Sequence, residues 1–190
     1  MNEKLKQEIK KSIEILRKGG VIVYPTDTIW GIGCDATNET AVKRIYEIKR
    51  RADSKSMLVL LDDVGKIASY ADVPDISYEL IEASDKPLTV IYPNSRGLAA
   101  GLPAEDGSIG IRITKEEFTR NLLFQFHKPI VSTSANVSGE PSPTAFRDIS
   151  DDILNAVDYV VDYRREENGG THPSSIIKFD ADGSFKIIRK

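Results

Sequence analysis

The sequence predicts an α/β protein with an open, twisted, mixed β-sheet flanked by helices. Short apolar runs typical of buried strands alternate along the chain with segments whose apolar residues recur at helical spacing. The chain ends in two apolar segments, 175–179 and 185–189, which are joined by a turn and predict an antiparallel hairpin. The 190 residues suffice for one compact domain with a core, so a single domain over residues 1–190 is expected.

The first half of the chain is expected to begin with a helix over residues 3–18, because apolar residues recur there at helical spacing and Gly19-Gly20 follows them. Asn38 is expected to cap a second helix. The buried stripe of that helix is expected to be Ala41, Val42, Ile45 and Ile48. The other expected elements are strands at 21–24, 29–34, 57–61 and 88–92, a short helix at 62–70 and a helix from Pro74 through Ile81.

The second half begins with a glycine-containing segment, 94–107, whose lack of periodicity predicts a long loop. A helix over 115–127 is expected to bury its regularly spaced apolar side chains, which are Phe118, Leu122, Leu123 and Phe126. The remaining expected elements are strands at 108–113, 130–133 and 159–162 and a capped helix near 150–156, followed by the terminal hairpin.

The composition excludes several classes of protein. With 40% hydrophobic and 29% charged residues, the chain is typical of globular proteins, and no apolar run is long enough to span a bilayer. The net charge of −3 argues against a surface that grips nucleic acid throughout, so any such site must be a local basic patch. The single cysteine, Cys34, cannot form an internal disulfide, which favours a reducing, cytoplasmic setting. The two histidines, His127 and His172, are isolated, and no metal site is expected.

Two polar segments directly follow predicted strands. Thr26–Thr28 comes after the first strand, and Ser132–Asn136 comes at the end of a later one. Open α/β sheets bind ligands outside the carboxyl ends of their strands, and neutral hydroxyl and amide groups can hold a ligand's oxygens there. The alternative is that these residues only hydrogen-bond to their own backbone at the transition from strand to loop.

Cations gather after the second predicted helix and at one strand position. The cluster consists of Lys43, Arg44, Lys49, Arg50, Arg51 and Lys55. Such a run is as often a solvated helix face, but Lys49 and Arg51 could clamp a polyphosphate, with the arginine supplying bidentate contacts. Arg112 interrupts an otherwise apolar strand. It either faces solvent from an edge strand or faces the site, where it would suit a carboxylate.

These pieces resemble those of one known family. They are the stretch YPTDTIWGIG, the K-x-R of Lys49 and Arg51, the strand SIGIRI, the loop STSANVSGEPSPT and the strand start HPSSII. Together they are similar to the YrdC-type (TsaC) family of threonylcarbamoyl-AMP synthases, and the resemblance runs from Val21 to the final strand. It implies the YrdC-like fold, in which a twisted mixed sheet and helices surround a positively lined concavity.

The resemblance also implies a reaction. L-Threonine, bicarbonate and ATP would be condensed to threonylcarbamoyl-AMP and pyrophosphate, which is an adenylyl transfer catalysed by a nucleotidyltransferase. Mg²⁺ would accompany ATP, held mainly by phosphate oxygens and water. The adenylate would pass to tRNA-modification proteins that make threonylcarbamoyladenosine beside the anticodon. An RNA contact at the basic concavity is a further implied interaction, and no membrane is involved.

The family's site residues carry over position by position. Those implied for threonine are Thr28, Arg112, Ser134 and Ser174, with Arg112 taking the carboxylate. Those implied for ATP are Lys49, Arg51, Lys55, Ser108, Asn136, Thr144 and Arg189, of which Lys49 and Arg51 are the expected catalytic cations. The sequence departs from the family at Leu60, where many members have histidine, and at Ala52, where proline is frequent.

Two other functions remain open from the sequence. An RNA-binding module could use the same concavity without chemistry of its own, although the acidic net charge and the many small hydroxyls favour a small anionic ligand. A carbamoyl-transfer domain of the same fold, as in larger maturation proteins, is the third alternative.

Overall fold

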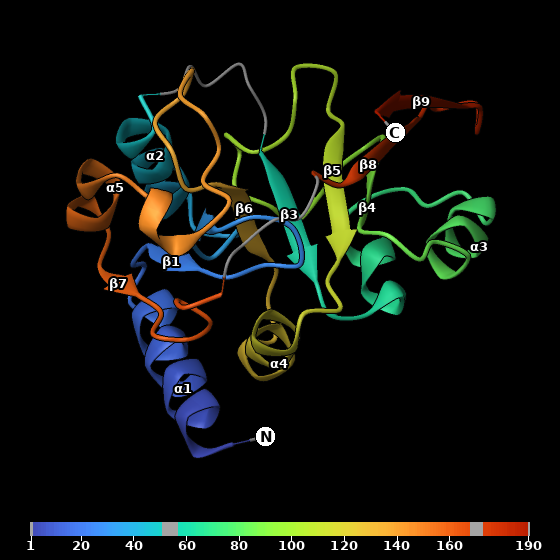
Figure 1. Ribbon diagram of the computed structural model, residues 1–190. Helices are drawn as coiled ribbons and strands as arrows, with labels where there is room; N and C mark the ends of the chain where they lie inside the picture. Colours follow the sequence, from blue (N-terminus) through green and yellow to red (C-terminus); the bar gives the residue numbers. More distant parts are fainter. Residues whose placement is uncertain (1, 51–56, 168–172, 190) are drawn as a thin grey trace.

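The computed structural model describes residues 2–50, 57–167 and 173–189 (Figure 1). Helices and strands alternate along the chain, and two short 3₁₀ helices, η1 and η2, lie among them. In chain order the elements are α1 (Glu3–Arg17), β1 (Ile22–Tyr24), β2 (Gly31–Gly33), α2 (Glu39–Ile48), β3 (Leu58–Leu61), η1 (Val64–Ser69), α3 (Ile76–Glu82), β4 (Leu88–Tyr92), β5 (Ile109–Ile113), α4 (Glu117–Phe126), β6 (Ile130–Ser134), η2 (Phe146–Asp148), α5 (Asp151–Ala156), β7 (Tyr159–Val160), β8 (Ser175–Phe179) and β9 (Phe185–Arg189).

The strands form one sheet in the order β7-β1-β2-β6-β3-β5-β4-β8-β9. The pairs β7–β1, β3–β5 and β4–β8 are parallel, and the other neighbouring strands are antiparallel. The predicted open, mixed sheet and its terminal hairpin, β8–β9, are therefore confirmed. In the part of the chain that the structure describes, no helix is long and apolar enough to cross a membrane.

The two faces of the sheet carry separate hydrophobic cores, because successive side chains of a strand point to opposite faces. Val21 and Val23 belong to the first core, which also takes the buried faces of α2 and α5. Ile22 and Tyr24 belong to the second core, where the only helices that contribute buried residues, within the described ranges, are α1 and α4. Figure 1 shows α1 and α4 together at one end of the molecule.

The ends of α1 and α2 follow the sequence closely, whereas Ser150, the N-cap of α5, makes no side-chain capping hydrogen bond and the expected cap of that helix is corrected. The amides of Gly19 and Gly20 donate to the carbonyls of Leu16 and Ile15, and Gly19 has a positive φ of 77°, which is the Schellman arrangement expected after α1. Asn38 caps α2 as predicted, accepting from the amide of Ala41 at 3.0 Å.

Three local expectations are corrected. The short helix expected at 62–70 is the 3₁₀ helix η1, and β7 covers only Tyr159–Val160 of the expected strand. In α2, Tyr46 is buried while Ile48 is only half-buried. The Tyr46 hydroxyl donates to the carbonyl of Gly101 in the long loop.

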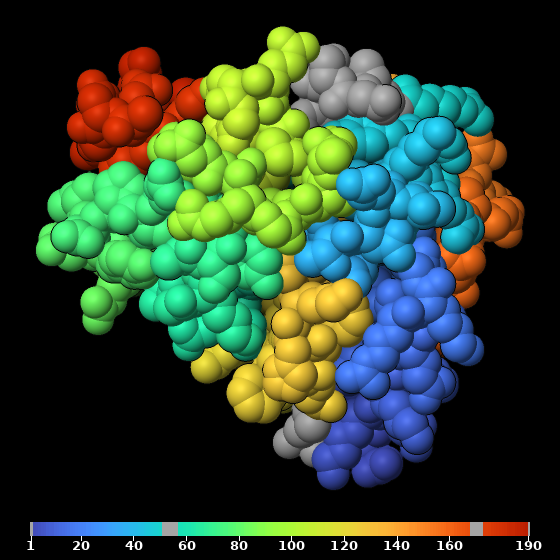
Figure 2. Space-filling model, turned by 180° about the vertical axis from the view of Figure 1, so that it is seen from behind, coloured from blue at the N-terminus to red at the C-terminus, as the bar shows by residue number. Residues whose placement is uncertain are grey.

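The long loop 94–107 packs on the first core instead of standing free. Ala99 and Leu102 are buried there, and the amide of Ala99 donates to the carbonyl of Ala36. Figure 2 shows this segment, coloured yellow-green, spread over the back of the molecule between the green region of η1 and α3 and the cyan region that contains α2. The loop therefore covers the face of the sheet opposite to the one that α1 and α4 cover.

Candidate active site

A pocket of about 250 Å³ lies on the sheet face that α1 and α4 cover only in part. Its floor and walls come from segments far apart in the sequence: the turn after β1, the start of β3, Arg112 of β5, the end of β6 and the residues around Ser174. The predicted site residues that line it are Thr28, Arg112, Ser134, Ser174 and Arg189. All four residues expected to bind threonine thus converge on one cavity.

The strand register explains why this part of the face is open. Leu60 of β3 lies opposite Arg112 of β5 and Ile130 of β6, so these three side chains share a face. Leu60 and Ile130 are fully buried in the second core. Two pairs further along the strands, and so on the same face, Leu58 lies opposite Ser132, and both line the pocket. The apolar core therefore ends where hydroxyl and guanidinium groups begin, and Leu60 belongs to the core side of that border.

Gly31 keeps the floor of the pocket open. A Cβ atom at this position would lie 3.1 Å from the Cγ2 of Thr26 and 3.5 Å from the Oγ of Ser132. A side chain here would therefore crowd the wall and take up space among the hydroxyl groups. Glycine, which has no Cβ, permits this close approach of the backbone.

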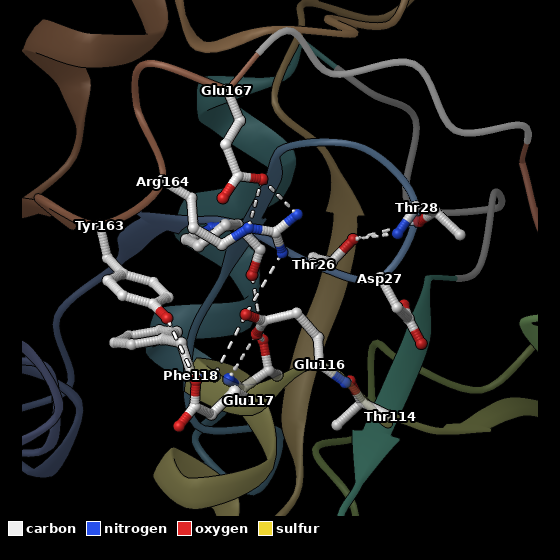
Figure 3. Close-up of polar contacts among 12 residues, drawn as sticks. Thr26, Asp27, Thr28, Thr114, Glu116, Glu117, Phe118, Tyr163, Arg164 and Glu167 are labelled. Atoms are coloured by element: carbon white, nitrogen blue, oxygen red, sulfur yellow. Dashed lines mark hydrogen bonds and ion pairs between the residues drawn. The ribbon is translucent and has the colours of Figure 1, made fainter. Parts of the chain in front are cut away.

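Thr26 builds the turn that holds Thr28. Its hydroxyl donates to the carbonyl of Ile29 at 2.7 Å, and it accepts the amide of Thr28 at 3.0 Å. The two hydroxyl oxygens are 3.1 Å apart (Figure 3). Since the one hydrogen of Thr26 is directed to Ile29, we infer that the Thr28 hydroxyl donates to Thr26 and keeps its lone pairs for a donor on a ligand.

Arg112 is a buried cation with unused hydrogen-bond donors. Its side chain is 4% exposed, and its ion pair joins Nη2 to Oδ1 of Asp27 at 3.2 Å. Within the described ranges its guanidinium makes no hydrogen bond, and both Nε of Arg112 and Oδ1 of Asp27 are buried without one. The pair thus has the distance of an ion pair without hydrogen-bond alignment. A guanidinium in this state has donors available for an acceptor such as a carboxylate.

The wall opposite the turn is held by side chains of three strands and their flanks. The hydroxyl oxygens of Ser174 and Thr89 are 2.8 Å apart, and Nε of Arg189 donates to the carbonyl of Ser174 at 2.9 Å. Arg189 ends the exposed strand β9, which brings its guanidinium to the rim of the pocket. Ser174 is therefore held by contacts with Thr89 and Arg189 that need no ligand.

Lys49 lies beneath the segment Ser134–Asn136 and lines neither this pocket nor the second one described below. It is 1% exposed, and its Nζ donates to the carbonyl oxygens of Ser134 and Asn136, the latter at 2.7 Å. Its own carbonyl accepts the amide of Ser138 at 2.8 Å. Lys49 therefore clasps the segment with both its side chain and its backbone.

A second pocket, of about 470 Å³, adjoins the first and shares Ser142 with it. It is lined by two of the residues expected to bind ATP, Asn136 and Thr144. Nδ2 of Asn136 donates to the carbonyls of Val137 and Glu140 at 3.0 and 2.7 Å, so this side chain shapes the loop that forms the wall. The arrangement offers two adjacent cavities, one beside a buried guanidinium and one beneath a stiff, proline-containing loop.

Ser108, also expected at the ATP site, lines neither of these pockets. Its hydroxyl donates to Oδ1 of Asp106 at 2.5 Å, and Nζ of Lys178 donates to the other oxygen of that carboxylate at 2.5 Å. The ion pair with Lys178 and the bonds from Ser108 hold the pKa of Asp106 well below its usual value. Arg51 and Lys55, which complete the expected ATP set, and His172 lie outside the described residues.

Sequence reasoning missed Asp27 and Ser142. Asp27 could have been found, because an arginine buried on an apolar strand needs a counter-charge, and Asp27 is the acid within the polar segment after β1. Ser142 carried no such signal, since only the fold brings its loop between the two pockets. Among the described residues, no group of three or more histidine, cysteine, aspartate or glutamate side chains could hold a metal ion.

The fold and the site define an α/β protein with a hydroxyl-lined cavity that contains a buried guanidinium. A family model for Sua5, YciO and YrdC proteins, described as "Telomere recombination", matches residues 14–190, and the chain belongs to this family.

Similar sequences and a similar solved structure support this assignment. A Methanocaldococcus jannaschii protein is 37% identical over 186 residues, which cover 95% of this chain and 86% of its own. The threonylcarbamoyl-AMP synthase of Pseudoalteromonas translucida is 31% identical over 172 residues, covering 88% and 91%. The crystal structure of P. abyssi Sua5 complexed with L-threonine superimposes with a TM-score of 0.82 at 25% identity over 94% of this chain. Because the match covers 52% of the Sua5 chain, this protein spans about half of that one.

Proposed function

We propose that this protein is an L-threonylcarbamoyladenylate synthase, which condenses L-threonine, bicarbonate and ATP to threonylcarbamoyl-AMP and pyrophosphate. The names of its relatives support this activity, as does the threonine bound to P. abyssi Sua5. The observation that carries the proposal is the first pocket, where Arg112 has unused donors beside the hydroxyls of Thr28, Ser134 and Ser174. The reaction makes the protein a nucleotidyltransferase.

The first pocket suits an amino acid that carries both a carboxylate and a hydroxyl. Arg112 would take the carboxylate, because a planar guanidinium matches it with two parallel hydrogen bonds. Thr28, whose hydroxyl has lone pairs free for a donor, would accept from the ligand's hydroxyl or amine. Ser134 and Ser174, which also line the pocket, would supply further neutral contacts.

The second pocket would hold the nucleotide. It shares Ser142 with the first pocket, so a nucleotide there would direct its α-phosphorus toward the amino acid. Asn136 and Thr144 would contact the nucleotide directly, and Lys49 would act through the Ser134–Asn136 segment that it clasps. Arg189 at the rim of the first pocket, together with Ser108, Arg51 and Lys55, completes the set that the family pattern assigns to ATP.

The chemistry requires positioning and charge stabilisation and no covalent enzyme intermediate. The amine of threonine takes up carbon dioxide from bicarbonate, with loss of water, and becomes a carbamate. A carbamate oxygen then attacks the α-phosphorus of ATP, and pyrophosphate leaves in line. The cations would offset charge on the triphosphate, with Mg²⁺ held by phosphate oxygens and water, since the described residues offer no acidic metal cage.

The product would be transferred to proteins that modify tRNA, because a mixed anhydride of this kind hydrolyses readily in water. The competing function is an RNA-binding module without catalysis, and the two respond differently to small ligands. A synthase should be stabilised against heat by L-threonine. An RNA-only protein should ignore threonine and bind RNA with a steep dependence on salt concentration.

The direct test is an incubation with ATP, ¹⁴C-bicarbonate and L-threonine, followed by chromatography of the products. We expect label in threonylcarbamoyl-AMP and one pyrophosphate released for each molecule formed, and no labelled product when threonine is replaced by L-valine, which lacks the hydroxyl. Pyrophosphate release that does not depend on threonine, or no release with all three substrates present, would contradict the proposal.

A further inference from the structure

The turn that carries Thr28 is tied to helix α4 by one buried hydroxyl. Thr119, in the first turn of α4, is 0% exposed, and its Oγ1 donates to the carbonyl of Pro25 at 3.0 Å. Pro25 opens the turn in which Thr26 holds Thr28. A contact between residues this distant in sequence fixes where the turn sits above the sheet.

The single hydrogen of the Thr119 hydroxyl is shared between two acceptors, the carbonyl of Pro25 and the carboxylate of Glu116, which is the N-cap of α4. Oε2 of Glu116 lies 2.8 Å from Oγ1 of Thr119 and accepts the amide of Thr119 at 2.7 Å. Oε1 accepts the amide of Phe118 at 3.1 Å and Nη1 of Arg164 at 3.3 Å. Figure 3 shows this carboxylate between Arg164 and the start of α4, with the Thr26–Thr28 turn above it.

Arg112 lies only a few residues before Glu116 in the chain. The contacts of Glu116, Thr119 and the turn therefore form a closed ring with Arg112. Starting at Arg112, the chain runs through Thr114, whose Oγ1 accepts the amide of Glu116 at 3.3 Å. From Glu116 and Thr119 the ring continues through Pro25 to Asp27, and the ion pair of Asp27 returns to Arg112. The ring includes the carboxylate-binding guanidinium and the backbone of the turn that presents Thr28.

We propose that Thr119, held by Glu116, is a positioning residue that sets the spacing between Thr28 and Arg112 for the bound amino acid. The proposal rests on the proposed function, because it concerns the threonine-binding pocket. Thr119 lines neither pocket and acts through the carbonyl of Pro25. Loss of its hydroxyl would leave that buried carbonyl without its side-chain donor, and the turn would move away from Arg112 to regain a partner.

Nucleotide binding in the second pocket serves as an internal control for threonine binding in the first. Its lining residues lie between 135 and 150 and include none of the members of the ring. A change at Thr119 should therefore weaken threonine binding and leave nucleotide binding unchanged. A general loss of stability would affect both pockets.

The test compares Thr119→Val with Thr119→Ser in the full chain. Valine keeps the branched shape without the hydroxyl, and we expect the KM for L-threonine to rise about 10-fold, since loss of one buried hydrogen bond has an effect of this order. We expect kcat at saturating threonine and the Kd for ATP to stay within about twofold of wild type. Serine, which retains the hydroxyl, should restore the KM.

Ser12→Ala is the matched control. Ser12 is also a fully buried helical hydroxyl, and it donates to the carbonyl of Glu8 on α1, away from the turn. We expect Ser12→Ala to lower the melting temperature and leave the KM for threonine unchanged. An unchanged KM in Thr119→Val, or an equal rise in Ser12→Ala, would overturn the proposal.

Two further measurements keep the result interpretable. If Thr119→Val does not fold, Glu116→Gln, which keeps the cap oxygen but loses the charge that holds Thr119, should show the same selective rise in KM. Hydrogen exchange at the amide of Thr28, which donates to Thr26, should be faster in the variant than in wild type. If the wild-type protein does not bind threonine, the proposed function is refuted, whatever the exchange rate. If exchange at the Thr28 amide is unchanged in the variant, the positioning role is refuted.

Discussion

Two buried cations, Arg112 and Lys49, stand beside the candidate site in opposite states. Both are nearly inaccessible, at 4% and 1% exposure. The guanidinium of Arg112 faces a pocket and, within the described ranges, makes no hydrogen bond, with Asp27 as its ion-pair partner. The ammonium of Lys49 donates to two carbonyls of the Ser134–Asn136 segment. The sequence predicts the same role, ligand binding, for both.

The difference shows that burial of a charge does not by itself identify a ligand contact. Taking a cation out of water is costly unless it gains polar partners. Lys49 has gained them from the protein, and its ammonium group holds the segment whose Ser134 lines the first pocket and whose Asn136 lines the second. Arg112 has kept its donors, which under the proposed function would bind the carboxylate of the substrate. One cation therefore supports the loop, and the other is the candidate ligand contact.

The largest expected effect is that of removing the unused donors. Arg112→Met should raise the Kd for L-threonine by about 100-fold or more, because two charge-assisted hydrogen bonds to the carboxylate are lost. Arg112→Lys should fall between this variant and wild type, since it keeps the charge opposite Asp27 without the planar fork. Isothermal titration with threonine measures the effect. Arg120→Met, which removes an exposed arginine from α4, is the control. A threonine Kd near the wild-type value in Arg112→Met would show that Arg112 does not bind the carboxylate.

The next effect tests whether Lys49 works through the loop. Lys49→Met leaves two buried carbonyls without this donor, and we expect the free energy of unfolding to fall by about 2–4 kcal/mol. Because Asn136 then loses its place, affinity for AMP and for ATP should fall by the same factor, about 10-fold. If Lys49 instead contacted the triphosphate directly, Lys49→Met would lower the affinity for ATP much more than the affinity for AMP. Lys43→Met, on the exposed side of α2, should leave both affinities unchanged.

A smaller effect is expected from the counter-charge of Arg112. Asp27→Asn keeps the shape of the side chain but leaves the buried guanidinium unpaired, so the free energy of unfolding should fall by about 1–3 kcal/mol. Urea denaturation measures this change. Asp85→Asn is the matched control, because Asp85 lines the same small hollow as Asp27 but is exposed. An equal loss in both variants would mean that the Asp27–Arg112 pair contributes little.

The sequence predicted the helices and strands and the residues that converge on the first pocket. It predicted much less about the hydrogen bonds that their polar atoms make. Hydrophobic spacing and caps predicted the helices and the mixed sheet, and the family pattern predicted that Thr28, Arg112, Ser134 and Ser174 would converge. It could not predict that Lys49 is engaged by carbonyl groups. The direction of a carbonyl depends on the path of a loop, and the direction of a long side chain depends on what surrounds it.

Ser108, like Lys49, has its polar group engaged by the protein itself. The expected effect of replacing it on ATP binding is therefore small. The family pattern places it at the ATP site, yet its hydroxyl is engaged by Asp106, which also pairs with Lys178. We therefore expect Ser108→Ala to change the Kd for ATP by less than about threefold, since the hydroxyl would first have to leave a charged partner. Fluorescence titration with a labelled ATP analogue measures this, and a much larger loss would mean that Ser108 turns from Asp106 to the nucleotide.

The Asp106 contact also predicts how this corner responds to acid. The pKa of Asp106 is depressed in the folded state, so its contribution to stability is present above the usual value of 3.8 and is lost as the pH falls below it. Because the carboxylate is largely exposed, Asp106→Asn should cost no more than about 1 kcal/mol near pH 6, and the difference from wild type should vanish in acid. Asp182→Asn is the matched control: Asp182 accepts the amide and hydroxyl of Ser184 in the same way, but Lys178 pairs with Asp106. A larger pH-dependent loss in Asp106→Asn than in Asp182→Asn would assign the difference to Lys178, and equal losses would assign the effect to the turn alone.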